Sequence, residues 1–178
     1  SVRVGFNEIV DTQVLSARYS PTTGWSAVTV LGRFMRPSIP STVNTKVAFG
    51  PGGDVIVAWE EFVSEQNRRI VAVRHSRTSG WQPSVVLASG PSFKLFLSSW
   101  IREGTLAIDS AGNAWVVWGV QDPLLSCAED AWGARFTPTN GWEPAQRLIV
   151  GTDGIRMIPR IASLSNGDAM FLLTGGEG

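Results

Sequence analysis

Six acidic residues stand outside the repeated pattern of this sequence and are the first candidates for chemistry. They are Glu60, Glu61, Glu65, Asp122, Glu129 and Asp130. Two carboxylates at a suitable separation can hydrolyse a glycoside, one as the acid and the other as nucleophile or base. We expect these residues after the second strand of a repeated unit or in the loop before the third, on one rim. The alternative, a merely solvated acidic loop, is the commoner case and is favoured over catalysis.

Three arginines occupy equivalent places in the sequence. Arg18, Arg74 and Arg135 each lie seven residues before a tryptophan. A guanidinium group matches the geometry of a carboxylate, so three converging arginines could hold an acidic ligand. Equivalent residues of successive units radiate apart, however, and we expect these side chains to pair with neighbouring units or turns.

The tryptophans that follow these arginines are candidates for ligand binding. Trp25, Trp81 and Trp142 are each preceded by a glycine. An indole offers a flat apolar face and a hydrogen-bond donor, so it can stack on a sugar ring. The other interpretation is that each tryptophan fixes the fourth strand of its unit onto the third, and its recurrence in every unit favours this packing role.

His75 is the only histidine, and it fills the position that Tyr19 and Phe136 fill in the other units. This predicts an aromatic packing role and leaves no histidine pair for a metal. A catalytic triad would need this same histidine, and no nucleophile elbow accompanies it. Phosphate loops, dinucleotide fingerprints, zinc spacings and EF-hand patterns do not occur, so we expect no metal and no cofactor.

Two sequence blocks recur along the chain and predict its elements. The first ends in Gly-Trp and reads SARYSPTTGW, AVRHSRTSGW and GARFTPTNGW; the second reads KVAFGPGGDVIVAWE, TLAIDSAGNAWVVWG and RIASLSNGDAMFLLT. Each copy of the second block is a strand, a tight Gly, Asn or Asp turn and a strand. One unit therefore contains strands at residues 47–49, 54–60, 70–76 and 85–88, which form a four-stranded antiparallel meander.

The fold class is all-β, with about three such meanders arranged as β-propeller blades in a single region, residues 1–178. The units cover approximately residues 1–45, 46–104, 105–159 and, in part, 160–178. The sequence enters near the end of a second strand at Phe6 and leaves after another at Leu173. Because closed propellers usually have about four to eight blades, we expect a longer chain or an oligomer to complete the ring.

Composition limits the partners. The 15 basic and 15 acidic residues cancel, which argues against nucleic acid, and no run of apolar residues is long enough for a transmembrane segment. The least polar departure from the repeat is residues 93–101 (FKLFLSSWI). Phe93, Phe96 and Trp100 in it are candidates for a protein interface, and a strand packed in the core is the equal alternative.

The segment AIDSAGNAWVVW, followed by ARF and GW, resembles the sialidase-like, BNR-type repeats of bacterial secreted and surface propellers. Asp109, Gly112 and Trp115 echo the Asp-box of those repeats. The Gly-Trp pairs are similar to those of tandem-repeat lectin propellers, in which aromatic residues between blades hold sugars. The resemblance covers nearly the whole chain and implies an extracellular, cell-surface or periplasmic protein.

These observations together predict non-enzymatic recognition or a scaffold role, with a glycan or a protein as the partner. One alternative is a sialidase-like glycoside hydrolase, which requires an arginine triad and an acid pair at one mouth of the ring. Another is a structural subunit of a larger assembly.

Overall fold

The computed structural model describes residues 9–37, 44–63, 67–90, 93–94, 105–121, 129–150, 155–163 and 168–177. The fold is all-β, and the one helical segment within these residues is the 3-10 turn Pro51–Gly53. None of the described segments forms a helix that is long and apolar enough to cross a membrane.

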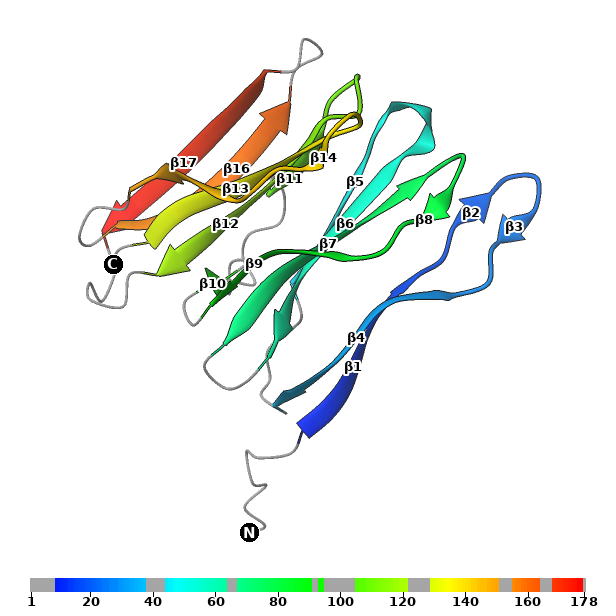
Figure 1. Ribbon diagram of the computed structural model, residues 1–178, viewed down its shortest axis with the longest axis horizontal. Helices are drawn as coiled ribbons and strands as arrows, with labels where there is room; N and C mark the ends of the chain where they lie inside the picture. Colours follow the sequence, from blue (N-terminus) through cyan, green and yellow to red (C-terminus); the bar gives the residue numbers. More distant parts are fainter. Residues whose placement is uncertain are drawn as a thin grey trace.

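The strands form antiparallel sheets that follow one another along the chain (Figure 1). In the N-terminal sheet, β1 (Ile9–Ser16) pairs with β4 (Thr29–Pro37), and β2 (Tyr19–Ser20) pairs with β3 (Gly24–Trp25) beside them. The second sheet consists of β5 (Thr45–Phe49), β6 (Val55–Phe62), β7 (Arg68–Ser76), β8 (Gly80–Trp81) and β9 (Val85–Gly90).

The third sheet consists of β10 (Phe93–Lys94), β11 (Leu106–Ile108), β12 (Ala114–Gln121), β13 (Glu129–Thr137), β14 (Gly141–Trp142) and β15 (Gln146–Ile149). The C-terminal sheet pairs β16 (Ile155–Ser163) with β17 (Ala169–Glu177). Two sheets are therefore complete meanders, and the sheets at either end contain one long strand pair each.

The expected meander is confirmed in the second sheet, where β5, β6, β7 and β9 pair in that order. Its strands are longer than the sequence predicts. In particular, β6 continues to Phe62 and β7 begins at Arg68, because the paired strands extend past the expected loop. The Gly-Trp segment also forms the short strand β8 on the end of β7.

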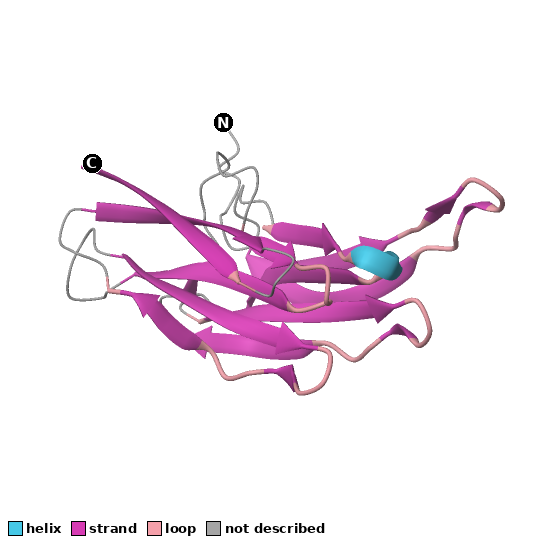
Figure 2. Ribbon diagram, turned by 90° about the horizontal axis from the view of Figure 1, so that it is seen from above, coloured by secondary structure: helices cyan, strands magenta, loops and turns pink. Residues whose placement is uncertain are grey.

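The sheets stack face to face, so the second sheet is covered on both sides (Figures 1 and 2). Residues that alternate along a strand point to opposite faces. In β6, Val57 and Trp59 pack toward the N-terminal sheet, whereas Ile56 and Ala58 pack toward the third sheet. Every residue of β6 after Val55 is consequently buried, as expected for a strand between two layers.

A bulge occurs at the same place in three sheets. Between β1 and β4, between β7 and β9 and between β13 and β15, the fourth strand carries one extra residue with no register partner. These residues are Leu31, Leu87 and Leu148. A bulge bends its strand and increases the local twist, so the three sheets share a distortion that the hydrophobic pattern alone did not predict.

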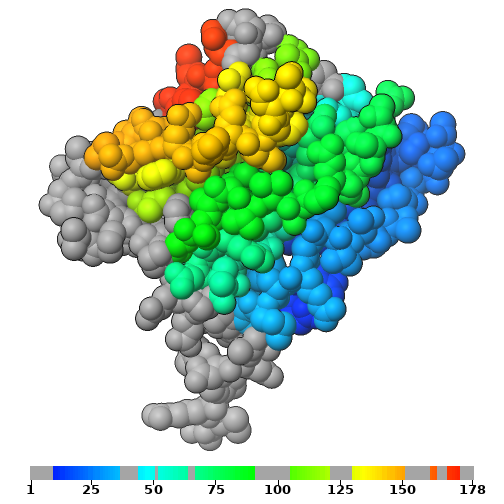
Figure 3. Space-filling model, in the orientation of Figure 1, coloured from blue at the N-terminus to red at the C-terminus, as the bar shows by residue number. Residues whose placement is uncertain are grey.

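The stack does not close on itself within the described residues. The N-terminal and C-terminal sheets lie at its opposite ends, and each has one face that no described sheet covers (Figures 1 and 3). The segment around Phe6 lies outside the described residues.

Candidate functional site

The sequence analysis expected Glu60 at the end of the second strand and Glu61 after it, on an exposed rim, and the structure shows both residues buried within a strand. Both belong to β6, and their exposed fractions are 3% and 4%. Glu60 forms an ion pair with Arg68, and Glu61 forms one with Arg69. The loop placement of Glu61 was wrong because β6 and β7 remain paired through Glu61 opposite Arg69 and Phe62 opposite Arg68.

The two carboxylates cannot act as a catalytic pair in this arrangement. Adjacent residues of a strand point to opposite faces, and each carboxylate is neutralised by its own arginine. Glu61 also accepts a hydrogen bond of 2.8 Å from the indole Nε1 of Trp59. A buried charge needs a partner and saturated hydrogen bonds. The two ion pairs meet this need and join β6 to β7.

Glu129 and Asp130 also belong to a strand, because β13 begins at Glu129. Asp130 is half-buried, and Arg147 of β15 lies 3.3 Å from it. Phe93 pairs through its backbone with Val120 of β12. Outside the described residues lie Glu65, Asp122, Phe96 and Trp100.

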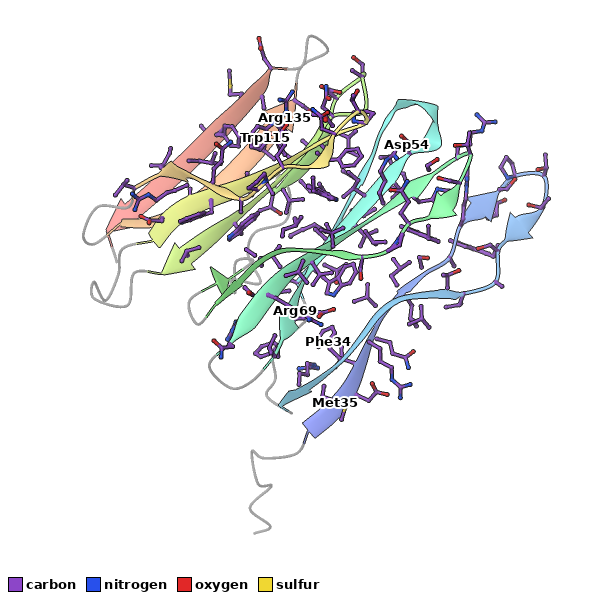
Figure 4. The ribbon with its side chains drawn as sticks, viewed as in Figure 1. Phe34, Met35, Asp54, Arg69, Trp115 and Arg135 are labelled. Atoms are coloured by element: carbon purple, nitrogen blue, oxygen red, sulfur yellow. The ribbon has the colours of Figure 1, made fainter. Side chains whose placement is uncertain are left out.

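Two of the recurring arginines, Arg74 and Arg135, form side-chain contacts that differ from each other. Arg74 donates to Asp54 at 2.6 Å, and its guanidinium lies over the ring of Phe136 in the third sheet, 5.1 Å from the centroid. Arg135 lies 3.7 Å from Glu143 (Figure 4 labels Asp54 and Arg135). The contacts of Arg74 and Arg135 agree with the expectation of pairing to turns and neighbouring units.

Each recurring tryptophan packs on the aromatic residue of the third strand in its own unit. The ring centroids of Tyr19 and Trp25 are 5.4 Å apart, and those of His75 and Trp81 are 5.0 Å apart. The corresponding pair in the third sheet, Phe136 and Trp142, is separated by 5.4 Å. The expected aromatic role of His75 is confirmed by this contact. Each contact joins the short Gly-Trp strand to the strand it pairs with, which is β2, β7 or β13.

Asp109, the acidic residue of the segment that resembles an Asp-box, organises a turn. Its Oδ1 accepts hydrogen bonds of 2.8 Å from the backbone N–H groups of Ala111 and Asn113, and its Oδ2 accepts one of 2.7 Å from Asn113 Nδ2. The side chain is buried. Both oxygens of its carboxylate therefore support the β11–β12 connection.

The described residue with the most exposed indole is Trp25, and it lies on a larger apolar surface. Side chains more than half exposed gather on the side of the N-terminal sheet that faces away from the second sheet, and we call them the outer face: Leu15, Tyr19, Trp25, Val30 and Met35. Figure 4 shows Phe34 on the side of the second sheet and Met35 on the opposite side. Strand alternation of β1 and β4 is the signal that could have found this surface.

The residues equivalent to the outer face are covered elsewhere in the molecule. Leu15 corresponds to Val71 in the aligned Gly-Trp blocks, and Val71 is buried beneath the N-terminal sheet. Trp81 and Trp142, which correspond to Trp25, are half-buried and pack against the clusters between sheets. The outer face is thus a sheet-packing surface that lacks a neighbour among the described residues.

Comparison with protein families, curated proteins and solved structures finds no match. The candidate site therefore has to be judged on its own geometry. Within the described residues, no three His, Cys, Asp or Glu side chains gather in a way that could hold a metal ion. The outer face is one surface whose exposure the packing of the described residues does not explain.

Proposed function

We propose that the chain is a non-enzymatic scaffold or recognition protein, built of propeller-type blades, that docks another β-sheet on its outer face. The observation that carries the proposal is the exposure of Leu15, Val30 and Met35, between 53% and 57%, on a sheet whose other face is packed. Exposed apolar side chains on one face of a sheet, here interrupted by Gln13 and Arg33, mark an interaction site in soluble proteins. A sheet is the partner that fits, because the equivalent surface of the second sheet is covered by a sheet.

The charges of the outer face suit a protein partner. Arg33 donates to both carboxylate oxygens of Asp11 at 2.6 to 3.0 Å, so neither side chain presents an unpaired charge. Interfaces combine an apolar centre with a polar rim. The outer face has apolar side chains and an ion pair of this kind. The aromatic pair Tyr19 and Trp25 lies at one end of it and the ion pair lies toward the other.

Hydroxyl-radical labelling of the protein as purified from its natural source tests this proposal. A docked sheet protects Leu15, Met35 and Trp25 from oxidation, and mass spectrometry measures the rate at each. Val47 on β5 is the matched control, because its exposed fraction of 53% equals that of Leu15 and it lies outside the outer face. If the outer-face residues are labelled at the rate expected for residues as accessible as Val47, the docked sheet is refuted.

Glycan binding is a second candidate, and the exposure of one aromatic pair favours it. Trp25 is 71% exposed and Tyr19 is 58% exposed, so their rings are open to a sugar. A glycan panel screened with the wild type, Trp25→Ala and Trp81→Ala tests this candidate. Binding that is lost in Trp25→Ala and kept in Trp81→Ala supports it, and a wild type that retains no glycan removes it.

A further inference from the structure

A buried tryptophan recurs in the second strand of two sheets, and its own strand supplies a hydrogen-bond acceptor in only one of them. In the aligned hairpin blocks, Trp59 of β6 corresponds to Trp118 of β12, and both side chains are fully buried. The indole of Trp59 donates to Glu61 at 2.8 Å, whereas the residue equivalent to Glu61 in the third sheet is Val120. A valine side chain accepts no hydrogen bond, so Trp118 lacks the acceptor that Trp59 has.

Two buried indole donors of the third sheet have no acceptor among the described residues. Trp132 of β13 stands directly opposite Trp118 in the strand register, so the two side chains are neighbours on one face of the sheet. The Nε1 atoms of both are buried, and neither has a hydrogen-bond partner in the part of the chain that the structure describes. Buried donors in native proteins are nearly always paired with protein or with ordered water, because an unpaired one is costly.

The sheet that faces these indoles carries a buried carboxylate. Trp118 packs with Ile70 between the second and third sheets, and Ala88 lies against the same cluster. Across the second sheet, Ala88 pairs with Ile70 and Ile70 pairs with Glu60, so the three residues form one row. Residues of one row point to the same face. Glu60 therefore faces the third sheet, in the same layer as the two indoles.

This row lies at the level of Trp118. In the layer between the N-terminal and second sheets, a Cβ at Gly32 would lie 2.7 Å from Cζ2 of Trp59, so these two residues are in close contact. Gly32 and Ala88 each follow the extra leucine of their bulge and are therefore equivalent. The next layer accordingly sets Trp118 against Ala88, in agreement with their shared cluster. The row of Ala88 ends at Glu60.

We infer that ordered water between the second and third sheets accepts the hydrogen bonds of Trp118 and Trp132 and donates to the carboxylate of Glu60. Buried water makes about three hydrogen bonds to polar groups of the protein, and two indoles with one carboxylate supply that number. A carboxylate has about four acceptor positions, so the bond from Arg68 leaves Glu60 able to accept another. The water links the two sheets where Trp59 is instead satisfied within its own strand.

The chemistry of this site selects a small neutral molecule that both accepts and donates. Indole N–H groups only donate, so they offer no ligand to a metal cation. The carboxylate of Glu60 disfavours an anion, although Arg68 offsets part of its charge. Water meets both requirements and is small enough to lie between packed sheets. At this end of the layer β10 pairs with β12 and also contacts β7 and β9, so we expect the water to exchange slowly with bulk solvent.

NMR of the intact protein with 15N-labelled indoles tests the bound water. Cross-relaxation between an indole Hε1 proton and water distinguishes a bound molecule from bulk solvent, because its sign reports how long the two stay together. Trp118 and Trp132 should both show the sign of long-lived water. Trp59 is the matched control, since it is equally buried and donates directly to Glu61, and it should show no such signal. Absence of the signal at either indole of the third sheet overturns the inference.

Two leucine pairs test the part of Glu60. Glu60→Leu with Arg68→Leu removes the acceptor on the facing sheet without leaving an unpaired charge, and the water signal at both indoles of the third sheet should fall severalfold. Glu61→Leu with Arg69→Leu is the matched control, because this pair faces the N-terminal sheet, and it should leave both signals unchanged. Signals that survive the first change, or that fall equally in both variants, would show that Glu60 does not hold the water. Either result leaves the docking proposed for the outer face untouched, because the site lies on the other side of the second sheet.

Discussion

The second sheet and the N-terminal sheet carry the same sequence pattern and differ in what surrounds them. Val71 is 2% exposed, whereas Leu15, its equivalent, is 53% exposed. The second sheet lies between two neighbours, and the N-terminal sheet has one among the described residues. The difference shows that exposure at equivalent positions is set by the neighbouring sheet, and that the outer face keeps the composition of a packing surface.

The largest expected effect is a loss of stability that differs between the two sheets when one tryptophan of each is truncated. Trp59 is fully buried, and its indole donates to Glu61. Trp59→Ala should lower the free energy of unfolding by about 3–5 kcal/mol, because it leaves a cavity between two sheets. Denaturation in urea measures this loss.

Trp25→Ala is the control for that comparison. Trp25 is 71% exposed, so its truncation should cost the monomer less than about 1 kcal/mol. A similar loss of stability in both variants would show that the N-terminal sheet is packed on both sides in solution.

The next effect concerns the buried charges of the second sheet. Glu60 is 3% exposed and pairs with Arg68. Glu60→Ala should cost about 2–3 kcal/mol, since it leaves the arginine without its carboxylate in a largely dry place. Replacing both residues by leucine should recover most of the loss. A single variant as stable as the wild type would mean that water already solvates this pair.

A smaller effect is expected where the two sheets touch. A Cβ at Gly32 would lie 2.7 Å from Cζ2 of Trp59, closer than atoms in contact allow. Gly32→Ala should therefore destabilise the chain by about 1–2 kcal/mol through overpacking. Adding Trp59→Phe creates space at this point, so the cost of Gly32→Ala should shrink in that background. An equal cost in both backgrounds would place the strain elsewhere.

Much of the fold follows from the sequence, because turns and alternation are local signals. The Gly-rich turns predicted the β5–β6 hairpin, in which Gly52 and Gly53 have φ of 81° and 88°, values that L side chains rarely adopt. The order of the meander also follows from short connections between alternating strands. The shared position of His75, Tyr19 and Phe136 predicted their aromatic contacts.

The candidate site could not be predicted to the same degree, because burial depends on how sheets stack. Glu60 looks like the exposed end of a strand and Glu61 like a loop residue when strand ends are judged by hydrophobicity alone. Counting register from the hairpin would have placed them beside Arg68 and Arg69, and that pattern of two acids followed by two arginines was the missed signal. No pattern within a single strand indicates the extra leucine of each bulge, such as Leu31. The bulge is seen only in how the two strands pair.

The smallest effect concerns the exposed ion pair of the outer face. Hydrogen bonds from Arg33 lower the pKa of Asp11 below its ordinary value of 3.8, against a smaller upward effect of desolvation, and the nearby positive charge adds to the lowering. A carboxyl whose pKa is lower in the folded state contributes stability above its unfolded pKa, and this contribution disappears as the pH falls through the folded pKa. The stability difference between wild type and Asp11→Asn should therefore be complete at neutral pH and vanish in acid.

The salt dependence of stability shows whether the ion pair of Asp11 and Arg33 is exposed or covered. An exposed pair is weak and screened, so in the monomer the small difference between wild type and Asp11→Asn should fall further at high ionic strength. A docked sheet excludes water and ions from the outer face, and the difference should then persist in salt. Urea unfolding of both proteins at low and high salt measures this. A difference that falls with salt as that of an exposed pair does would show that nothing covers this part of the N-terminal sheet.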